Sequence, residues 1–287
     1  MNRQDFQFFH PLRVRWVEVD MQKVVFNAHY LMYFDTAISG YWRSLVLPYE
    51  EAMQQLGGDL FVKKASLEFH ASALFDDRLD IGLKCERIGN SSMVFSGGIF
   101  RADELLVTGE WVYVFADPVL KAPKPVPDRL CALLGRAERG EALVTVKTGN
   151  WHELGADARS LRTEVFVGEQ GIPVELEWDE ADATALHAVA YNGIGQPVAT
   201  GRLLTQAPRT GKVGRMAVKR VLRGCNVGRQ LLLALLQSAR ERGDTEIVLN
   251  AQTSAQGFYR SSGFLPRGEL FDEVGIPHIE MVLLLEQ

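Results

Sequence analysis

The feature that most constrains the fold of this chain is a proline-rich interruption near its middle. The segment FADPVLKAPKPVPDRL, residues 115–130, contains four prolines, and proline interrupts helices and central strands because it lacks a backbone N–H. The apolar patterns on its two sides differ. Because 287 residues suffice for two domains, we predict one domain at residues 1–130, a linker at 131–142 and a second domain at 143–287.

The composition excludes several classes of protein. Hydrophobic residues make up 47% of the chain, which is enough for packed cores. No apolar run reaches the roughly 20 residues of a membrane span, and the first residues lack the apolar core of a signal peptide, so we expect a cytoplasmic protein. The net charge of -5 predicts no binding to nucleic acid or to membranes. The three cysteines are far apart and the six histidines show no metal-ligand spacing, so we expect free thiols and no metal.

The first half predicts one long helix packed on an antiparallel sheet. From Asn27 onward, apolar residues such as Leu31, Phe34, Ile38 and Tyr41 recur at the spacing of one helical face, which indicates a buried helix. Segments rich in valine, isoleucine and phenylalanine follow, separated by turn residues. This pattern is typical of an α+β domain. The predicted strands are residues 60–70, 79–87, 92–101 and 105–115.

Asp20 stands seven residues before the expected start of this helix. The free N–H groups at a helix start donate hydrogen bonds and form the positive end of the helix dipole, so they can stabilise the oxygen of a carbonyl under attack. A carboxylate beside them can attack the carbonyl carbon or deprotonate water. The alternative is that Asp20 only stabilises a turn, which is the more common role of an acid before a helix.

The residues around Asp20 resemble a known family. The stretch RVRWVEVDMQKVVFNAHYLMYFDTA resembles the opening of the hotdog-fold acyl-CoA thioesterases of the 4-hydroxybenzoyl-CoA thioesterase type, and LFDDRLDI and ELLVTGEWVYVFAD resemble later strands of that family. The resemblance implies that Asp20 is the catalytic carboxylate, as nucleophile or general base, and that an N–H near Asn27 polarises the thioester carbonyl. It also implies a homo-oligomer whose active sites are shared between two such domains. Many relatives carry glycine where this chain has Gln22 or Lys23, and one branch uses a histidine at the Asn27 position, a role for which His29 is the candidate here.

The second half alternates helices and strands, as α/β domains do. Strands are predicted at residues 187–191, 198–204 and 212–218, followed by a helix with a stripe of leucines. The turn RGCNVGR before this helix, residues 223–229, can direct backbone N–H groups at phosphate oxygens, and its arginines can add charge-assisted hydrogen bonds. Such a turn alone is a weak signal, because it is more often an ordinary helix start.

Six motifs in this half strengthen the signal. The stretches LRTEVFVGEQGIP, EWDEAD, TGRLL, VGRMAVKRVLRGCNVGRQLL, LNAQTSAQGFYRSSGF and GIPHIEM resemble the ElaA-like branch of the GNAT N-acetyltransferases. The resemblance implies that a strand ending at residue 218 holds pantetheine, that the following turn wraps the pyrophosphate, and that Tyr259 protonates the departing CoA thiolate rather than only packing. Asn226 stands where the family has glycine, and asparagine tolerates the left-handed conformation better than most residues. The implied CoA-binding residues are Met216, Ala217, Val218, Arg223, Gly224, Asn226, Val227, Gly228, Arg229 and Asn250.

The predicted fold is an α+β hotdog domain, with a long helix wrapped by an antiparallel sheet, followed by an α/β GNAT domain. Two functions follow. The first is a bifunctional enzyme that hydrolyses an acyl-CoA or acyl-carrier-protein thioester and transfers an acetyl or other acyl group from CoA to an amine. The alternative is a single-activity enzyme in which one domain is a non-catalytic CoA-sensing or oligomerisation module. The base that deprotonates the amine acceptor is left open among Glu177, Asp179, Glu180, His187 and His278.

Overall fold

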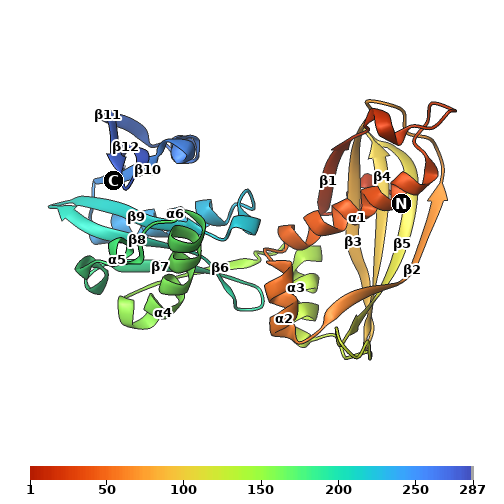
Figure 1. Cartoon of the computed structure of the whole chain (residues 1–287), viewed down its shortest axis with the longest axis horizontal. Coiled ribbons are helices and arrows are strands. Elements are labelled where there is room, and N and C mark those ends of the chain that lie inside the picture. The colour runs from red at the N-terminus through yellow and green to blue at the C-terminus, as the bar shows by residue number, and fades with distance from the viewer. Residues whose placement is uncertain (286–287) are drawn as a thin grey trace. The chain divides into compact units, whose positions relative to one another are not determined.

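The computed structural model describes residues 1–285 of a chain that divides into two compact units, Met1–Leu143 and Val144–Gln287 (Figure 1). Each unit has its own sheet and its own hydrophobic core. No helix among the described residues is long and apolar enough to cross a membrane.

The segment 131–142, predicted as a linker, lies within the first unit and contains most of α3 (Asp128–Glu138). Its amphipathic pattern buries three leucines on one face of this helix. At the last residue of α3, Glu138 Oε1 accepts hydrogen bonds from the Tyr41 hydroxyl at 2.7 Å and from the Cys85 N–H at 2.8 Å. These contacts join α3 to the rest of the first unit.

Within residues 1–143, all of which are described, five strands form an antiparallel sheet in the order β1-β3-β4-β5-β2. The long helix α1 lies along one face of this sheet (Figure 1), and it begins at Asn27, as the sequence predicts. The edge strands are β1 and β2. The elements before α3 are η1 (Arg3–Asp5), β1 (Phe8–Arg13), η2 (Trp16–Glu18), α1 (Asn27–Ser44), α2 (Tyr49–Leu56), β2 (Asp59–Phe69), β3 (Arg78–Ile88), β4 (Ser92–Arg101) and β5 (Glu104–Ala116).

The core of the first unit lies between α1 and the sheet. Phe34 of α1 packs on Trp111 of β5, with ring centroids 4.3 Å apart. Gly97 of β4 permits this approach, because a Cβ at that position would lie 2.6 Å from Phe34 Cε1. The prediction that Leu31 belongs to the buried face is wrong: its side chain is 42% exposed, since the face of α1 that meets the sheet is centred on other residues. The buried residues of α1 are Tyr30, Tyr33, Phe34, Ala37, Tyr41 and Trp42.

Over the described residues of the second unit, seven strands form one sheet in the order β11-β12-β10-β9-β8-β7-β6. Neighbouring strands are antiparallel except β9 and β10, which run parallel. The helices and short turns fill the connections, as the alternating pattern predicts. The elements are β6 (Val144–Gly149), α4 (Trp151–Arg162), η3 (Thr163–Glu169), α5 (Val174–Glu177), η4 (Glu180–Ala183), β7 (Leu186–Asn192), β8 (Pro197–Ala207), β9 (Thr210–Val218), η5 (Arg220–Leu222), α6 (Val227–Arg242), β10 (Glu246–Gln252), η6 (Thr253–Ala255), α7 (Gln256–Arg260), β11 (Leu265–Glu273) and β12 (Ile276–Leu284).

The helices α4 and α6 cover opposite faces of this sheet. Val189 of β7 packs in one cluster with Leu154 of α4. Successive residues of a strand point to opposite faces, so the neighbouring Ala188 and its cross-strand partner Gly201 face the other side. There a Cβ on Gly201 would lie 2.9 Å from Leu235 Cδ1 of α6. The glycine therefore allows α6 to pack closely on β8.

Candidate functional sites

A cavity of about 380 Å³ lies at the start of α1. It is formed by the loop after η2, the first turn of α1 and the residues that follow β2. Asp20 and Asn27, both predicted for the thioester site, line this cavity, whereas His29 is not among its lining residues. Other lining residues are Gln22, Phe26, Tyr30, Phe69, His70 and Ser72.

Asp20 both stabilises a turn and lines the cavity. Its Oδ1 accepts a hydrogen bond from the Gln22 N–H at 2.7 Å, and its own N–H donates to the Val24 carbonyl at 2.9 Å. The turn is closed by Lys23, whose φ of 63° lies in the left-handed region that glycine adopts most readily. Within residues 1–285, no hydrogen bond to the second carboxylate oxygen of Asp20 is found.

The first turn of α1 reaches the same cavity through Asn27, while Ala28 is not among the lining residues. Phe26 precedes the helix without any side-chain cap, and its own N–H donates to the Glu18 carbonyl at 2.9 Å. The N–H groups of Asn27 and Ala28 have no acceptor among the described residues, as expected for the first positions of a helix. The side chain of His29, which does not line the cavity, packs its ring edge-on against Phe26, with the ring centroids 6.2 Å apart.

Glu18 is a residue of this site that the sequence did not reveal. It is 2% exposed, and its carboxylate accepts hydrogen bonds from the Arg15 N–H at 2.7 Å and the Tyr33 hydroxyl at 2.8 Å. Burial acts to raise the pKa of Glu18, but these hydrogen bonds outweigh it and lower the pKa below the usual range. Because Glu18 connects the loop that contains Asp20 to α1 through Tyr33, it fixes the carboxylate relative to the helix start.

In the second unit, β9 and β10 diverge along their length. They pair only at their first residues, from Thr210 opposite Glu246 to Lys212 opposite Val248. Beyond this point β9 contains a bulge, at which Arg215 has a φ of 53°. The backbone of Met216 and Ala217 therefore has no strand partner on the β10 side. This is the segment predicted to hold pantetheine.

The turn that follows β9 presents backbone donors at the start of α6. Asn226 precedes the helix in the left-handed conformation, with a φ of 62°, so asparagine adopts the geometry expected of the glycine it replaces. Gly224 has a φ of 84°, and a Cβ there would meet no atom within 4 Å. Asn226 makes no side-chain cap bond, and the N–H groups of Val227 and Gly228 have no acceptor in the described part of the chain. The turn has the features of an anion site.

Arg223 of this turn is engaged by a carboxylate. Its Nη1 and Nη2 donate to the two oxygens of Glu169 at 2.6 and 2.7 Å, and its Nε lies 3.3 Å from the Val218 carbonyl. The guanidinium lowers the pKa of Glu169. Glu169 belongs to the quoted motif LRTEVFVGEQGIP, but a contact across 54 positions is not visible in one sequence. Phosphate would have to compete with this carboxylate for Arg223.

The remaining predicted residues of the second site lie around α6, α7 and β10. A Cβ on Gly228 would lie 3.3 Å from Val218 Cγ2, so this glycine serves the packing of α6 on β9. Tyr259 of α7 is 8% exposed, and burial raises its pKa to about 12, so its phenol keeps its proton at neutral pH. Asn250 donates from Nδ2 to Glu273 at 3.1 Å. Arg229 is exposed on the first turn of α6.

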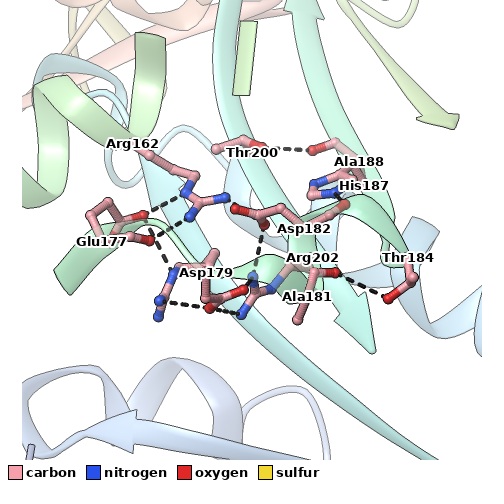
Figure 2. A network of polar contacts seen from close by, with 11 residues as sticks. Arg162, Glu177, Asp179, Ala181, Asp182, Thr184, His187, Ala188, Thr200 and Arg202 are labelled. Atoms are coloured by element: carbon pink, nitrogen blue, oxygen red, sulfur yellow. Dashed lines mark hydrogen bonds and ion pairs between the residues drawn. The ribbon is translucent and has the colours of Figure 1, made fainter. Parts of the chain in front are cut away.

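A buried ionic network holds the acidic loop of the second unit against its sheet (Figure 2). Arg162 at the end of α4 donates to Asp182 at 2.8 Å and to the Glu177 carbonyl at 2.7 Å. Arg202 of β8 donates to the same Asp182 oxygen at 2.7 Å and to Asp179 at 2.6 Å. The side chains of Arg162, Glu177 and Asp182 are 1%, 3% and 5% exposed. The network extends to the bulge of β9 through Arg215, whose Nη2 lies 3.1 Å from Asp179.

The burial and pairing of these side chains reduce the number of residues that could deprotonate the amine acceptor. Glu177 is buried and paired with arginines, and desolvation raises its pKa. His187 is 1% exposed, with Nε2 2.9 Å from the Asp182 carbonyl, and burial lowers its pKa. His278 is also buried, with Nδ1 2.8 Å from the Ile276 carbonyl. Hydrogen bonds from Arg202 lower the pKa of Asp179, which makes it a weak base as well. Glu180 is exposed and stays a possible base.

Comparisons with known proteins match both halves of the chain. The family model of the thioesterase superfamily matches residues 22–108, and that of the acetyltransferase (GNAT) domain matches residues 156–285. An uncharacterized N-acetyltransferase YjcF of Bacillus subtilis is 39% identical over 127 residues, which cover 44% of this chain and 89% of that protein. Protein ElaA of Escherichia coli is 36% identical over 125 residues, which cover 42% of this chain and 81% of ElaA.

Solved structures match each half separately. The crystal structure of Escherichia coli ElaA is 32% identical, covers 49% of this chain and 99% of its own, and has a TM-score of 0.45. The 1,4-dihydroxy-2-naphthoyl-CoA thioesterase Slr0204 of Synechocystis is 20% identical, covers 45% of this chain and 95% of its own, and has a TM-score of 0.42. The predicted families and fold class are confirmed by the two family models. The chain belongs to the GNAT acetyltransferases through its second half, and its first half is a hotdog-type domain of the thioesterase superfamily.

Proposed function

We propose that this chain is a bifunctional enzyme, in which the first unit hydrolyses an acyl thioester of CoA or of an acyl carrier protein. In the same proposal, the second unit transfers an acetyl or other acyl group from CoA to an amine. The observation that carries it is the placement of the Asp20 carboxylate in one cavity with the start of a helix whose first N–H groups have no acceptor among the described residues. For the second unit, support comes from the relatives in the acetyltransferase family.

The hydrolysis in the first unit follows from helix-start electrostatics. The thioester oxygen accepts hydrogen bonds from the N–H groups of Asn27 and Ala28, which stabilise the negative charge that develops when the carbonyl is attacked. Asp20 attacks the carbonyl carbon itself or takes a proton from the water that attacks it. The C–S bond then breaks and the thiolate leaves, and where Asp20 was the nucleophile, water hydrolyses the acyl-Asp20 anhydride to release the acid and restore the carboxylate. Glu18 and Tyr33 keep the loop of Asp20 in place during this step.

The transfer in the second unit uses CoA as the leaving group. The pyrophosphate binds at the turn 223–229, and pantetheine lies along the part of β9 that diverges from β10. The amine forms a C–N bond with the carbonyl carbon and gives up a proton to a base or to water. The C–S bond breaks, and the sulfur takes a proton from the Tyr259 phenol, which its raised pKa keeps protonated until that moment. The phenolate then regains a proton from solvent. Asn250 lies on the diverging strand and completes the predicted CoA site.

Two assays on the full chain test the proposal. Release of free thiol from a panel of acyl-CoA thioesters without any amine measures hydrolysis, and formation of an N-acyl product from acetyl-CoA and a panel of amines measures transfer. Both activities are expected. If only one activity is found and the other unit binds CoA without turning it over, the alternative is established, in which one domain is a CoA-sensing or oligomerisation module.

The Arg223–Glu169 pair predicts how CoA affinity responds to substitution. Arg223→Ala is expected to weaken binding roughly tenfold, because a charged donor to phosphate is lost while the Glu169 carboxylate remains. Glu169→Gln is expected to tighten binding, because it frees Arg223. Gly228→Val is expected to weaken binding more than either, since its side chain pushes α6 away from Val218. The measurement is calorimetric titration of the full chain with a thioether analogue of acetyl-CoA.

Arg240→Ala is the matched control for these titrations. Arg240 is exposed on the last turn of the same helix, far along α6 from the turn 223–229, and its loss is expected to leave affinity unchanged. If Gly228→Val is folded and binds the analogue as well as the wild type does, the turn is not the phosphate site.

The first unit is expected to form a homo-oligomer with a second copy of the chain. An edge strand leaves unpaired backbone groups, and β2 is an edge strand with Val62 56% exposed. Beside it, a shallow cavity of about 270 Å³ is lined by Leu31, Met32 and Trp111, among others. Sedimentation velocity at micromolar concentration is expected to show at least a dimer, and Val62→Glu is expected to shift it toward monomer. A monomeric wild type would contradict this proposal.

A further inference from the structure

The cavity at the start of α1 contains a second group able to exchange protons, which none of the sequence motifs assigns. His70 follows the last residue of β2 and lines the cavity together with Asp20. Its backbone N–H donates to the Leu106 carbonyl at 2.8 Å, and its Nε2 lies 3.1 Å from the Thr108 hydroxyl oxygen on β5. The pairing of β2 with β5 therefore fixes both the backbone and the ring of His70.

His70 differs from the other ionisable groups of this cavity. Among the described lining residues these groups are Asp20, Tyr30 and His70. Tyr30 is 2% exposed, and burial raises its pKa, so it keeps its proton. The adjacent charged groups are Arg101 and Asp77, which form an ion pair of 2.8 Å with each other. An imidazolium carries an N–H on each ring nitrogen and can donate a proton, so among the lining residues His70 is the group whose chemistry suits an acid.

We propose that His70 donates the proton that the departing thiolate takes up, an inference that rests on the proposed hydrolysis in the first unit. An oxygen of Asp20, or of water that Asp20 activates, forms a bond to the carbonyl carbon. The C–S bond breaks with its electron pair going to sulfur, and the sulfur takes a proton from the His70 imidazolium. The imidazole regains a proton from the water consumed in the reaction, directly or through Asp20. Thioester and water thus give carboxylic acid and thiol.

The geometry favours His70 over His29, the histidine that the sequence pointed to. His70 lines the cavity and His29 does not. The two can be separated experimentally, because a proton donor to sulfur matters only for a basic leaving group. The alkyl thiolate of CoA needs the proton, whereas an aryl thiolate, which is far less basic, leaves without it.

The experiment compares His70→Gln with wild type on two thioesters of the same acyl group, one of CoA and one of an aryl thiol. Glutamine keeps a polar group near Thr108 but cannot deliver a proton. The expected result is a fall in kcat of about a hundredfold for the CoA thioester and of less than about threefold for the aryl thioester. The pH–rate profile for the CoA thioester is also expected to lose its dependence on a protonated group. His10→Gln, the same substitution on β1 outside the cavity lining, serves as the control that changes neither rate.

Several outcomes would overturn the proposal. Equal losses on both thioesters would show that His70 acts only on the structure of the site, and unchanged rates would show no role. Leaving-group dependence in His29→Gln but not in His70→Gln would assign the acid to His29. If the wild type hydrolyses neither thioester, the proposed function and this proposal fail together, whereas hydrolysis that depends on Asp20 but not on His70 removes only the latter.

Discussion

Asp20→Asn is expected to reduce the hydrolysis of acyl-CoA by at least about a hundredfold. Asparagine retains an Oδ1 that can accept the hydrogen bond of the Gln22 N–H, so the turn is preserved. It lacks the negative charge needed to attack a carbonyl or to take a proton from water. The measurement is steady-state release of CoA thiol by the full chain, with kcat and KM determined separately. The loss is expected in kcat, because the carboxylate acts in the transition state.

Asp117→Asn provides a matched control for this prediction. Asp117 is another aspartate of the first unit whose Oδ1 accepts backbone hydrogen bonds, from the N–H groups of Val119 and Leu120 at 2.9 Å, but it does not line the cavity. Its substitution is expected to leave hydrolysis unchanged. A folded Asp20→Asn protein with wild-type kcat would remove Asp20 from the chemistry.

Arg162→Met is expected to destabilise the second unit by about 3–5 kcal/mol in free energy of unfolding, because it removes the nearest cation of the buried Glu177 carboxylate and one of the two arginines bound to Asp182. Methionine fills much of the same space, so the loss reflects unpaired charge more than a cavity. The measurement is hydrogen exchange of peptides from residues 144–285 in the full chain across a urea series. Peptides from residues 1–143 report separately on the first unit.

Arg159→Met is the control that separates the effect of the ion pairs on stability from the effect of the arginine–tryptophan contacts. The guanidinium of Arg159 lies 5.7 and 5.1 Å from the ring centroids of Trp151 and Trp178, and that of Arg162 lies 5.7 and 4.7 Å from the same rings. Arg159 is exposed and forms no ion pair among the described residues. Its substitution is expected to cost less than about 1 kcal/mol. Similar losses in both variants would mean that the carboxylates tolerate the missing cation.

The elements of both units could be predicted from the sequence because apolar periodicity is a local property. The start of α1 at Asn27 and the alternation of strands and helices after residue 143 follow from it. The face of a helix that meets the sheet depends instead on docking, which is why Leu31 is exposed. The helix α3 escaped prediction as part of the first unit because its anchors, Tyr41 and Cys85, lie far away along the chain.

The polar parts of the sites could be predicted only where a motif marked them. Asp20 and Asn27, both marked by the first motif, line one cavity, and their roles stay predictions. By contrast, an acid such as Glu18 or an arginine such as Arg162 is usually solvated, and nothing local shows that it is buried with partners elsewhere in the chain. His70 is a lone histidine after a strand, and its place in the cavity depends on tertiary structure.

The turn at residues 223–229, proposed to bind CoA, already holds an anion, because Arg223 is paired with the Glu169 carboxylate. A pyrophosphate that reaches this guanidinium does not neutralise a bare cation; it exchanges places with a carboxylate, which must then be rehydrated. An incoming anion therefore binds Arg223 only if it gains more free energy there than the Glu169 carboxylate loses. A singly charged ion such as chloride is expected to gain less here than a phosphate that can also bind the N–H groups of Val227 and Gly228, so under the proposed function the turn is expected to favour phosphate over abundant weak anions.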